Sequence, residues 1–277
     1  MPPPCRLAFT HLVRQPEAAI DLGEAALLIA KEEYPNLEVA EYLARLDGMA
    51  ADIRCAAGPS PDPRRLVDEL GEYLFRSQGF RGNVEEYYDP RNSFLNEVMD
   101  RRLGIPITLS AIYLQVGRRI GLNVHGVGMP GHFLVKVVES SAEIVIDPFN
   151  GGSVLSPDDC QRILDRLYDG KLCFEPEMLA TVGTRQILTR MLANLKGIYY
   201  NNQEYGKVLS VVERLLIVHP NSAGEIRDRG LLLYQLKRHA EASADLDRYL
   251  RLAPDAEDSE VIREHLRTLR QRAVALN

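Results

Sequence analysis

The stretch HGVGMPGHFLVKV, residues 125–137, decides how the middle of the chain folds. Three of its glycines have the spacing G-x-G-x-x-G, namely Gly126, Gly128 and Gly131. In a dinucleotide-binding fold such glycines leave a strand and open a helix, whose N–H groups hold the pyrophosphate. Here they lead into a β-branched, apolar run that is typical of a strand, and Pro130 removes an N–H that a phosphate loop would use. We therefore interpret the stretch as a tight turn that presents His132 at the start of a strand.

The segments on either side of this turn predict a helix and then an antiparallel hairpin. Upstream, ITLSAIYLQVGRRIGLN (107–123) has apolar residues at steps of three and four, which predicts a buried helix with Pro106 in its first turn and its end at Gly121. Downstream, the period changes to that of strands in VHGVG (124–128), HFLVKVVE and EIVIDPF (143–149). This part of the chain therefore predicts an α+β core.

The register of the expected hairpin brings two polar side chains to one face of the sheet. A turn through residues 139–142 sets Leu134 opposite Asp147 and Phe149 opposite His132. His132 and Asp147 then lie diagonally, about 7–8 Å apart at the backbone, and their side chains can meet. The pair has two interpretations: a base with the carboxylate that orients it, or a histidine held by a structural hydrogen bond.

The N-terminal part of the chain predicts helices. Apolar residues recur at helical spacing in residues 17–34, 39–57 and 62–78, and Pro35 and the GPSPDP cluster at 58–63 separate these segments. The polar stretch that follows has a candidate N-cap, Asn92-Ser93, for a short helix that ends near Leu103-Gly104. We expect the first three helices to be structural.

The C-terminal part carries an internal repeat. YNNQEYGKVLSVVERLLIVHP (200–220) and YQLKRHAEASADLDRYLRLAP (234–254) align at an offset of 34 residues, the period of a tetratricopeptide repeat. Gly230 and Ala242 supply small residues where the paired helices of the second copy must approach closely, whereas Lys196 stands opposite Gly230 in the first. Stacked repeats present a concave surface to a protein or peptide partner. Polar residues at the helix turns are candidates for partner contacts: Asn201, Asn202, Lys237 and Arg238.

Composition and charge limit the class of protein. The chain has 277 residues, 45% of them hydrophobic, so it can bury a real core. A net charge of -6 argues against a nucleic-acid partner, because phosphate binding needs a basic face. Residues 184–277 hold 15 Lys and Arg against 12 Asp and Glu, whereas residues 1–183 hold 18 against 27, which favours two units of different character.

Membrane insertion and secretion are not expected. No apolar run approaches the roughly 18 residues that cross a bilayer. The N-terminus lacks the basic and apolar layout of a secretory signal. The cysteines lie far apart and form no C-x-x-C pair, so we expect them to be reduced and the protein to be cytoplasmic: Cys5, Cys55, Cys160 and Cys173.

The order helix, glycine, strand with histidine, strand with Asp-Pro resembles the transglutaminase-like thiol enzymes. In that superfamily a cysteine at the N-terminus of the central helix is the nucleophile, a histidine on the next strand is its base, and an aspartate on the following strand orients the histidine. The resemblance implies the second role for His132 and the third for Asp147. It places the nucleophile around Pro106, but no cysteine occurs between Cys55 and Cys160.

The match narrows to a bacterial family, often labelled SirB-type, in which a degenerate transglutaminase-like domain precedes tetratricopeptide repeats. The segments that carry the resemblance are AALLIAKEEYP, YYDPRNSFLNEVMDRRLGIPITLSAIYLQVGRR, GVGMPGHFLVKV and IDPFNGG, with the repeats behind them. The resemblance covers nearly the whole chain and implies a papain-like α+β core.

Three residues are candidates to replace the missing nucleophile. Cys160 follows the strand of Asp147, but its acidic neighbours would raise a thiol pKa that a nucleophile needs lowered. Thr108 and Ser110 are displaced along the helix from the position where its dipole and His132 converge. Ser110 is instead expected to pack and to bond to a carbonyl.

Two further sets of residues are candidate sites. Arg91, Asn92 and Ser93 are expected at the entrance of the old cleft, with Ser110 nearby, or else in a capped helix start above the packed Tyr87 and Tyr88. The metal alternative uses scattered ligands and lacks a metal-binding motif, so neither a metal nor a cofactor is expected: His125, His132 and Asp147.

These observations predict a two-part protein. Residues 1–183 form an α+β, transglutaminase-like domain with an antiparallel sheet and a helical N-terminal region, and residues 184–277 form an all-α tetratricopeptide segment. We expect a non-catalytic regulatory or scaffold protein that binds a protein or peptide partner through the repeats and a degenerate cleft. The alternative is an amide-handling hydrolase or transferase that uses His132 and Asp147 with a substitute nucleophile.

Overall fold

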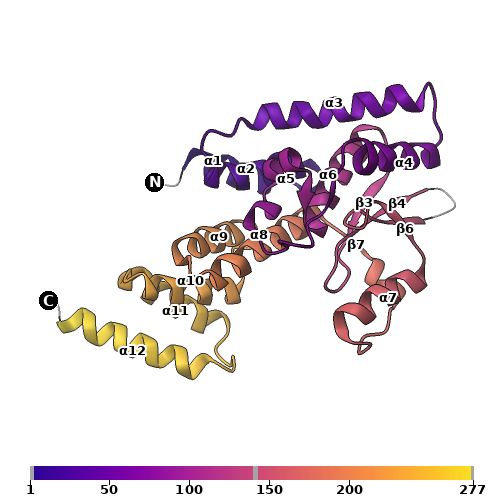
Figure 1. The fold of residues 1–277 in the computed structure, drawn as a ribbon. Helices are drawn as coiled ribbons and strands as arrows, with labels where there is room; N and C mark the ends of the chain where they lie inside the picture. Colours follow the sequence, from indigo (N-terminus) through magenta and orange to yellow (C-terminus); the bar gives the residue numbers. More distant parts are fainter. Residues whose placement is uncertain (1–2, 140–142, 276–277) are drawn as a thin grey trace. The chain divides into compact units, whose positions relative to one another are not determined.

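The chain divides into two compact units, residues 1–191 (unit 1) and 192–277 (unit 2). The computed structural model, drawn in Figure 1, describes residues 3–139 and 143–275. The division falls within one continuous helix, α8 (Thr184–Asn201), so no linker separates the units along the chain. The boundary expected between residues 183 and 184 stays a prediction.

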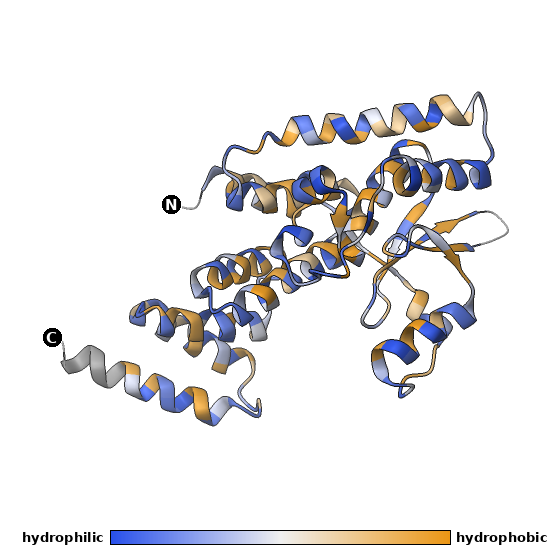
Figure 2. Ribbon diagram, in the orientation of Figure 1, coloured by the Kyte–Doolittle hydropathy of each residue, from blue (hydrophilic) through white to orange (hydrophobic). Residues whose placement is uncertain are grey.

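Unit 1 is helical in its first half. Its α-helices are α1 (Pro4–Val13), α2 (Leu22–Glu33), α3 (Val39–Ala57), α4 (Pro63–Gly71), α5 (Leu95–Arg101), α6 (Pro106–Arg119) and α7 (Pro157–Tyr168). Short 3-10 turns occupy Glu17–Ala19, Pro90–Ser93 and Pro176–Leu179, and a π-helical turn extends α4 over Glu72–Ser77. Figure 2 shows hydrophilic and hydrophobic residues alternating along α3, as expected for a helix with one buried side.

The expected N-terminal helices are partly confirmed. The segment 39–57 is α3, whereas the segment 17–34 is not one helix, because Asp21 begins α2 by accepting a hydrogen bond from the Glu24 N–H. The sequence patterns missed α1 and α7. The expected cap at Asn92-Ser93 was wrong, since α5 begins after Phe94.

Helix α6 is the centre of unit 1. All residues from Pro106 to Gly117 are buried, because α6 packs on α2, α3, α4 and α5 on one side and on strands β3 (Val124–Val127) and β4 (Leu134–Val138) on the other. The prediction of a buried helix with proline in its first turn is confirmed. It ends at Arg119, and Gly121 turns the chain with a φ of +96°.

The sheet is antiparallel and five-stranded, in the order β6-β5-β4-β3-β7. Strand β5 spans Glu143–Asp147, β6 Ser153–Leu155 and β7 Thr181–Val182, and a separate parallel pair joins β1 (Arg81–Gly82) to β2 (Leu103–Gly104). Val135 faces Ile146 across β4 and β5, which is the register that the hairpin predicted. The tip of the turn expected through 139–142 lies outside the described residues.

Unit 2 is all α-helical. After the end of α8 it contains α9 (Tyr205–Val218), α10 (Ala223–Gln235), α11 (His239–Leu252) and α12 (Ser259–Ala275). Helices α9 and α11 begin and end at positions of the two copies that the repeat equates. Gly230 of α10 lets α11 approach, because a Cβ there would lie 2.7 Å from Leu246 Cδ2. In the described ranges no helix of either unit combines the length and apolar content that crossing a bilayer requires.

Candidate functional sites

The glycine-rich turn of residues 128–131 holds the loop that carries His132. The His132 N–H donates to the Met129 carbonyl at 3.1 Å, and Gly131 has a φ of +68°, a conformation that favours glycine. Gly126 is required for a different reason, since a Cβ there would lie 2.9 Å from the Phe133 ring. The tight turn is confirmed, and His132 comes two residues before β4 begins.

The structure brings His132 and Asp147 together. Their side chains form a hydrogen bond of 2.9 Å between Nε2 and Oδ2, and they are 7% and 0% exposed. Nε2 is therefore occupied by the carboxylate, which leaves Nδ1 as the nitrogen that a nucleophile would need. The assignment of these residues as a base and its orienter stays a prediction.

Both carboxylate oxygens of Asp147 accept hydrogen bonds from the residues that follow it in the sequence. Oδ1 accepts from the backbone N–H groups of Phe149 and Asn150, at 3.0 and 3.3 Å, and Oδ2 accepts from the Asn150 side chain at 2.7 Å. Burial raises the pKa of Asp147, but the hydrogen bonds from His132 and Asn150 lower it by more than burial raises it. The pKa of Asp147 therefore lies below the ordinary value. Asp147 is thus a carboxylate at neutral pH.

Phe149 covers the pair from the side. Its ring lies edge-on to the His132 ring, 6.0 Å between centroids, and 6.1 Å from the ring of Tyr87. Gly82 makes room for it, because a Cβ at that position would lie 2.5 Å from the Phe149 ring. The motif IDPFNGG therefore supplies both the carboxylate that binds His132 and a ring that packs against the His132 ring.

The N-terminus of α6, where the resemblance places the nucleophile, carries apolar side chains. Ile105, Pro106 and Ile107 are all buried there. The nearest hydroxyl group on the helix, that of Thr108, donates to the Asn92 carbonyl at 2.7 Å and accepts from the Ile105 N–H at 3.1 Å. Thr108 therefore fixes the first turn of α6 to the preceding loop.

The residues expected at the cleft are mostly enclosed. Asn92, Ser93 and Ser110 are at most 1% exposed, and only Arg91 reaches the surface, where it pairs with Asp89. The Asn92 side chain donates to the Glu86 carbonyl at 2.7 Å, a contact that shapes the loop. The hydroxyl of Ser110 lies 3.5 Å from the Phe133 carbonyl, on the neighbouring strand connection.

Ser93 differs from its neighbours. Its hydroxyl is buried and has no hydrogen-bond partner among the residues described. It therefore forms no hydrogen bond with His132. The place of these residues in an active-site entrance stays a prediction.

Cys160 is enclosed in a hydrophobic cluster between the sheet and α7. The thiol is 1% exposed and packs with residues such as Met129, Leu134 and Leu164. Burial raises the pKa of Cys160, and the charges of Asp159 and Asp147 raise it further. The physical conditions are opposite to those of a thiolate nucleophile. The four cysteines form no disulfide.

The three candidate metal ligands, His125, His132 and Asp147, do not form a metal-binding cluster. The Nε2 of His125 bonds to Asn123 Oδ1 at 2.8 Å, while His132 and Asp147 bond to each other. In residues 3–139 and 143–275 no group of three or more His, Cys, Asp or Glu side chains is placed to hold a metal ion.

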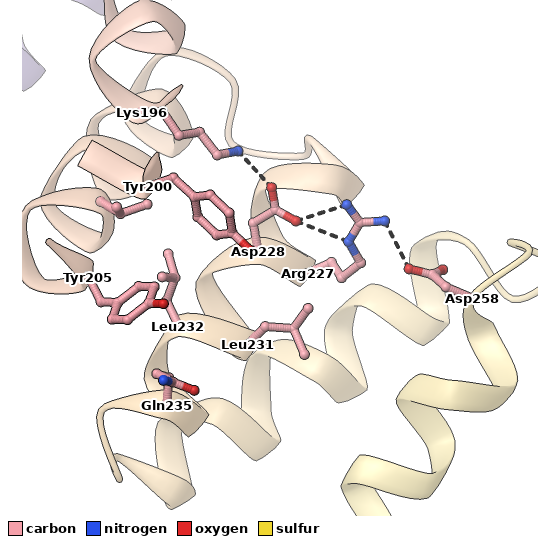
Figure 3. Close-up of a pocket in the computed structure, with 10 residues that line it drawn as sticks. Lys196, Tyr200, Tyr205, Arg227, Asp228, Leu231, Leu232, Gln235 and Asp258 are labelled. Carbon is pink, nitrogen blue, oxygen red and sulfur yellow. Dashed lines mark hydrogen bonds and ion pairs between the residues drawn. The ribbon is translucent and has the colours of Figure 1, made fainter. Parts of the chain in front are cut away.

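Unit 2 contains a pocket of about 450 Å³ between its helices. Figure 3 shows its wall, which combines aromatic, apolar and charged side chains, among them Lys196, Tyr200, Tyr205, Arg227, Asp228 and Leu231. The rings of Tyr200 and Tyr205 meet edge-on at 6.3 Å, and Tyr200 is 60% exposed. The pocket therefore offers an exposed aromatic surface to a ligand.

A chain of ion pairs forms the polar side of this pocket. Lys196 Nζ lies 2.7 Å from carboxylate oxygens of both Glu225 and Asp228, and Arg227 bridges Asp228 and Asp258 at 2.9 and 2.8 Å. Burial lowers the pKa of Lys196, but Asp228 and Glu225 raise it above its ordinary value. Both cations are therefore charged and neutralised within the unit.

The sequence reasoning missed this pocket. The sequence favoured polar residues at the helix turns, such as Lys237, whereas most residues that line the pocket lie within helices, for example Lys196 and Leu231. The available signals were Lys196, at a position where the other copy has a small residue, and Tyr200, which the alignment matches to Tyr234. A charged residue at a close-packed repeat position indicates a partner charge within reach.

Comparisons with known proteins agree with this architecture. The family model described as Transglutaminase-like superfamily matches residues 40–193, and the one described as Tetratricopeptide repeat matches residues 195–267. A UPF0162 protein of Xylella fastidiosa strain 9a5c is 36% identical over 262 residues, 93% of each chain. A UPF0162 protein of Vibrio cholerae is 28% identical over 253 residues, 91% of this chain and 93% of the relative.

A eukaryotic relative shares only part of the chain. F-box only protein 21 of Mus musculus is 29% identical over 139 residues, 47% of this chain and 21% of that protein. No solved structure matches the chain significantly. Fold and comparisons together define a transglutaminase-like domain followed by tetratricopeptide repeats. The chain belongs to the UPF0162 family of the transglutaminase-like superfamily, which confirms the SirB-type family expected from the sequence.

Proposed function

We propose that this protein is a non-catalytic binding protein, with a scaffold or regulatory role, that holds a segment of a protein or peptide partner in the pocket of unit 2. The observation that carries the proposal is the pocket itself, with an exposed Tyr200 beside Leu231. Tetratricopeptide repeats generally mediate protein–protein interactions through such surfaces. Because Lys196 and Arg227 are already neutralised, the pocket favours an apolar or aromatic anchor over a free anion.

The surroundings of His132 support the non-catalytic part of the proposal. The helix terminus that would carry a nucleophile presents Ile105, Pro106 and Ile107, and a base without a nucleophile in reach performs no acyl transfer. A reduced, cytoplasmic setting belongs to the same proposal, and the four free cysteines support it.

Photo-crosslinking tests the proposal in the full chain. Tyr200 is replaced by a photoreactive benzoyl-phenylalanine in bacterial cells, and Leu7, which is 58% exposed on α1, serves as the matched control. Irradiation is expected to give discrete protein adducts from position 200 and none from position 7. If position 200 yields no adduct, or the same adducts as position 7, the repeat pocket is not the binding site.

One observation favours a second candidate, an amide-handling hydrolase or transferase. The hydrogen-bonded His132–Asp147 pair is the arrangement such an enzyme needs for its base. Assays for transglutaminase, deamidase and peptidase turnover are expected to give none above background. Turnover that disappears in both His132→Ala and Cys160→Ala, yet persists in Cys55→Ala, would establish the enzyme instead.

A further inference from the structure

Arg190 lies against the glycine-rich turn and takes no part in the His132–Asp147 pair. Its Nη1 donates a hydrogen bond to the Met129 carbonyl at 3.3 Å, and its guanidinium carbon lies 5.4 Å from the centre of the Phe133 ring. A carbonyl and an aromatic face hold the guanidinium in position, but neither neutralises its charge.

No carboxylate pairs with Arg190 among the residues that the structure describes. Five positions earlier on the same helix, Arg185 pairs with Glu17 at 2.6 Å, and Arg229 of unit 2 binds both oxygens of Asp245 at 2.6 Å. Burial lowers the pKa of Arg190, and no acidic side chain offsets that effect. A partly desolvated, unpaired guanidinium gains more from an incoming anion than an exposed one does.

Two tyrosines complete the cluster. The Tyr168 hydroxyl lies 3.2 Å from the point that a Cβ on Gly131 would occupy, and Tyr87 and Tyr168 both raise the pKa of Arg190 against the larger effect of burial. Tyr87 and Tyr168 are 36% and 37% exposed. Within the described chain neither hydroxyl has a hydrogen-bond partner, so both can donate to a ligand.

The glycines of the turn keep this place free of side chains. A Cβ at Gly131 would lie 2.9 Å from Leu167 Cδ1, and one at Gly128 would lie 3.3 Å from Val182 Cγ1 and 3.9 Å from Arg190 Nη1. The turn therefore lets α7 and the start of α8 bring a hydroxyl and a guanidinium to the same short loop. Two glycines of the G-x-G-x-x-G spacing, Gly128 and Gly131, therefore border the cluster, whereas Gly126 makes room for Phe133.

We propose that Arg190, Tyr168 and Tyr87 bind a single carboxylate group, presented by a peptide at its C-terminus or on an acidic side chain. One guanidinium with two neutral hydroxyl donors matches a single negative charge and the planar shape of a carboxylate. A dianionic phosphate fits less well, because it brings two negative charges to one guanidinium, and the excess of acidic residues in 1–183, 27 against 18 basic, repels two charges more strongly than one. Leu167, 48% exposed, adds apolar contact for the residue that carries the carboxylate. This site is separate from the function proposed for unit 2.

Calorimetric titration of the full chain with three short peptides tests the site. The peptides are acetyl-Ala-Leu with a free C-terminus, its C-terminal amide, and acetyl-Glu-Leu amide, and inorganic phosphate is the fourth ligand. Binding is expected for a peptide with a carboxylate and not for the neutral amide, and the two acidic peptides distinguish a terminal from a side-chain carboxylate. Absence of binding by both acidic peptides, equal binding of the neutral amide, or tighter binding of phosphate would overturn the proposal.

Variants assign the binding to these residues. Arg190→Gln is expected to lower the affinity for the acidic peptide by about tenfold or more. Arg166→Gln, an equal charge change at an exposed position of α7, is expected to change the affinity by less than about twofold. Tyr168→Phe removes one hydroxyl from a partly exposed ring, so the fold is retained and affinity falls about two- to fivefold. If Arg190→Gln does not fold, Tyr168→Phe decides. Unchanged affinity in the folded variants contradicts the assignment.

Discussion

The two units use polar side chains in opposite ways. In unit 1, His132 and Asp147 are 7% and 0% exposed. Each oxygen of the carboxylate has a hydrogen-bond partner, His132 for Oδ2 and the Phe149 N–H for Oδ1. In unit 2, Lys196 and Arg227 form ion pairs along a pocket of about 450 Å³, beside a tyrosine that is 60% exposed. The polar groups of the buried pair satisfy one another and leave no wall open to a ligand, whereas the ion pairs of unit 2 lie beside a pocket with an exposed aromatic ring.

The largest expected effect is the loss of the buried carboxylate. Asp147→Ala removes the acceptor of His132 and of the Asn150 side chain, and it leaves the buried His132 ring without its partner, whereas the exposed Asn150 can bond to water. We expect the free energy of unfolding to fall by roughly 3–5 kcal/mol, measured by urea denaturation. Asp158→Ala, at an exposed position, is the control and should cost less than about 1 kcal/mol. A cost for Asp147→Ala as small as that of the control would remove the structural role of the pair.

A smaller loss is expected from crowding the repeat. Gly230→Val places atoms within 2.7 Å of Leu246 Cδ2, so α10 and α11 must separate, at a cost of about 1–3 kcal/mol. Hydrogen exchange at the amides of these two helices reports the effect locally. Gly224→Ala, where nothing lies within 4 Å, should be neutral. Equal protection in both variants would mean that the helices do not pack as closely as the structure has them.

The stability that Asp147 contributes is expected to depend on pH. The folded pKa of Asp147 is depressed, so its contribution is fully present above the ordinary carboxyl pKa of about 3.9 and is lost as pH falls through the folded pKa. Asp147→Asn should therefore cost about 1–3 kcal/mol at neutral pH, and the difference from wild type should shrink in acid below about pH 4. A difference that stays constant from pH 7 to pH 3 would contradict the depressed pKa.

The smallest effect on stability is expected at Tyr200, in the pocket where we propose that the partner binds. Tyr200→Ala removes an exposed ring from the pocket wall and should change the free energy of unfolding by less than about 0.5 kcal/mol, measured by urea denaturation. A loss comparable with that of Gly230→Val would assign Tyr200 to the core of the repeat.

Much of the fold could be predicted because it depends on local periodicity. The central helix, the hairpin register and the 34-residue repeat all appear in the spacing of apolar residues. Helix α7 was missed although Ser156 and Asp159 form a capping box, and α1 was missed because prolines at its start concealed a pattern that ends in Leu12 and Val13.

The sites were harder to predict because contacts across the chain create them. The approach of His132 to Asp147 follows from the strand register and was expected. The burial of Ser110 and the enclosure of Asn92 depend on how loops close over α6, which no local pattern records. The pocket of unit 2 likewise joins Lys196 to acids 29 and 32 residues away.

Partner binding at the pocket of unit 2 is tested by the affinity of three full-length proteins for the partner identified by crosslinking. Wild type, Tyr200→Ala and His132→Gln are titrated with that partner by calorimetry. We expect Tyr200→Ala to bind about tenfold or more weakly, and folded His132→Gln to bind within about twofold of wild type. An affinity that falls in His132→Gln and is unchanged in Tyr200→Ala would place binding at the His132–Asp147 pair and contradict binding at the pocket of unit 2.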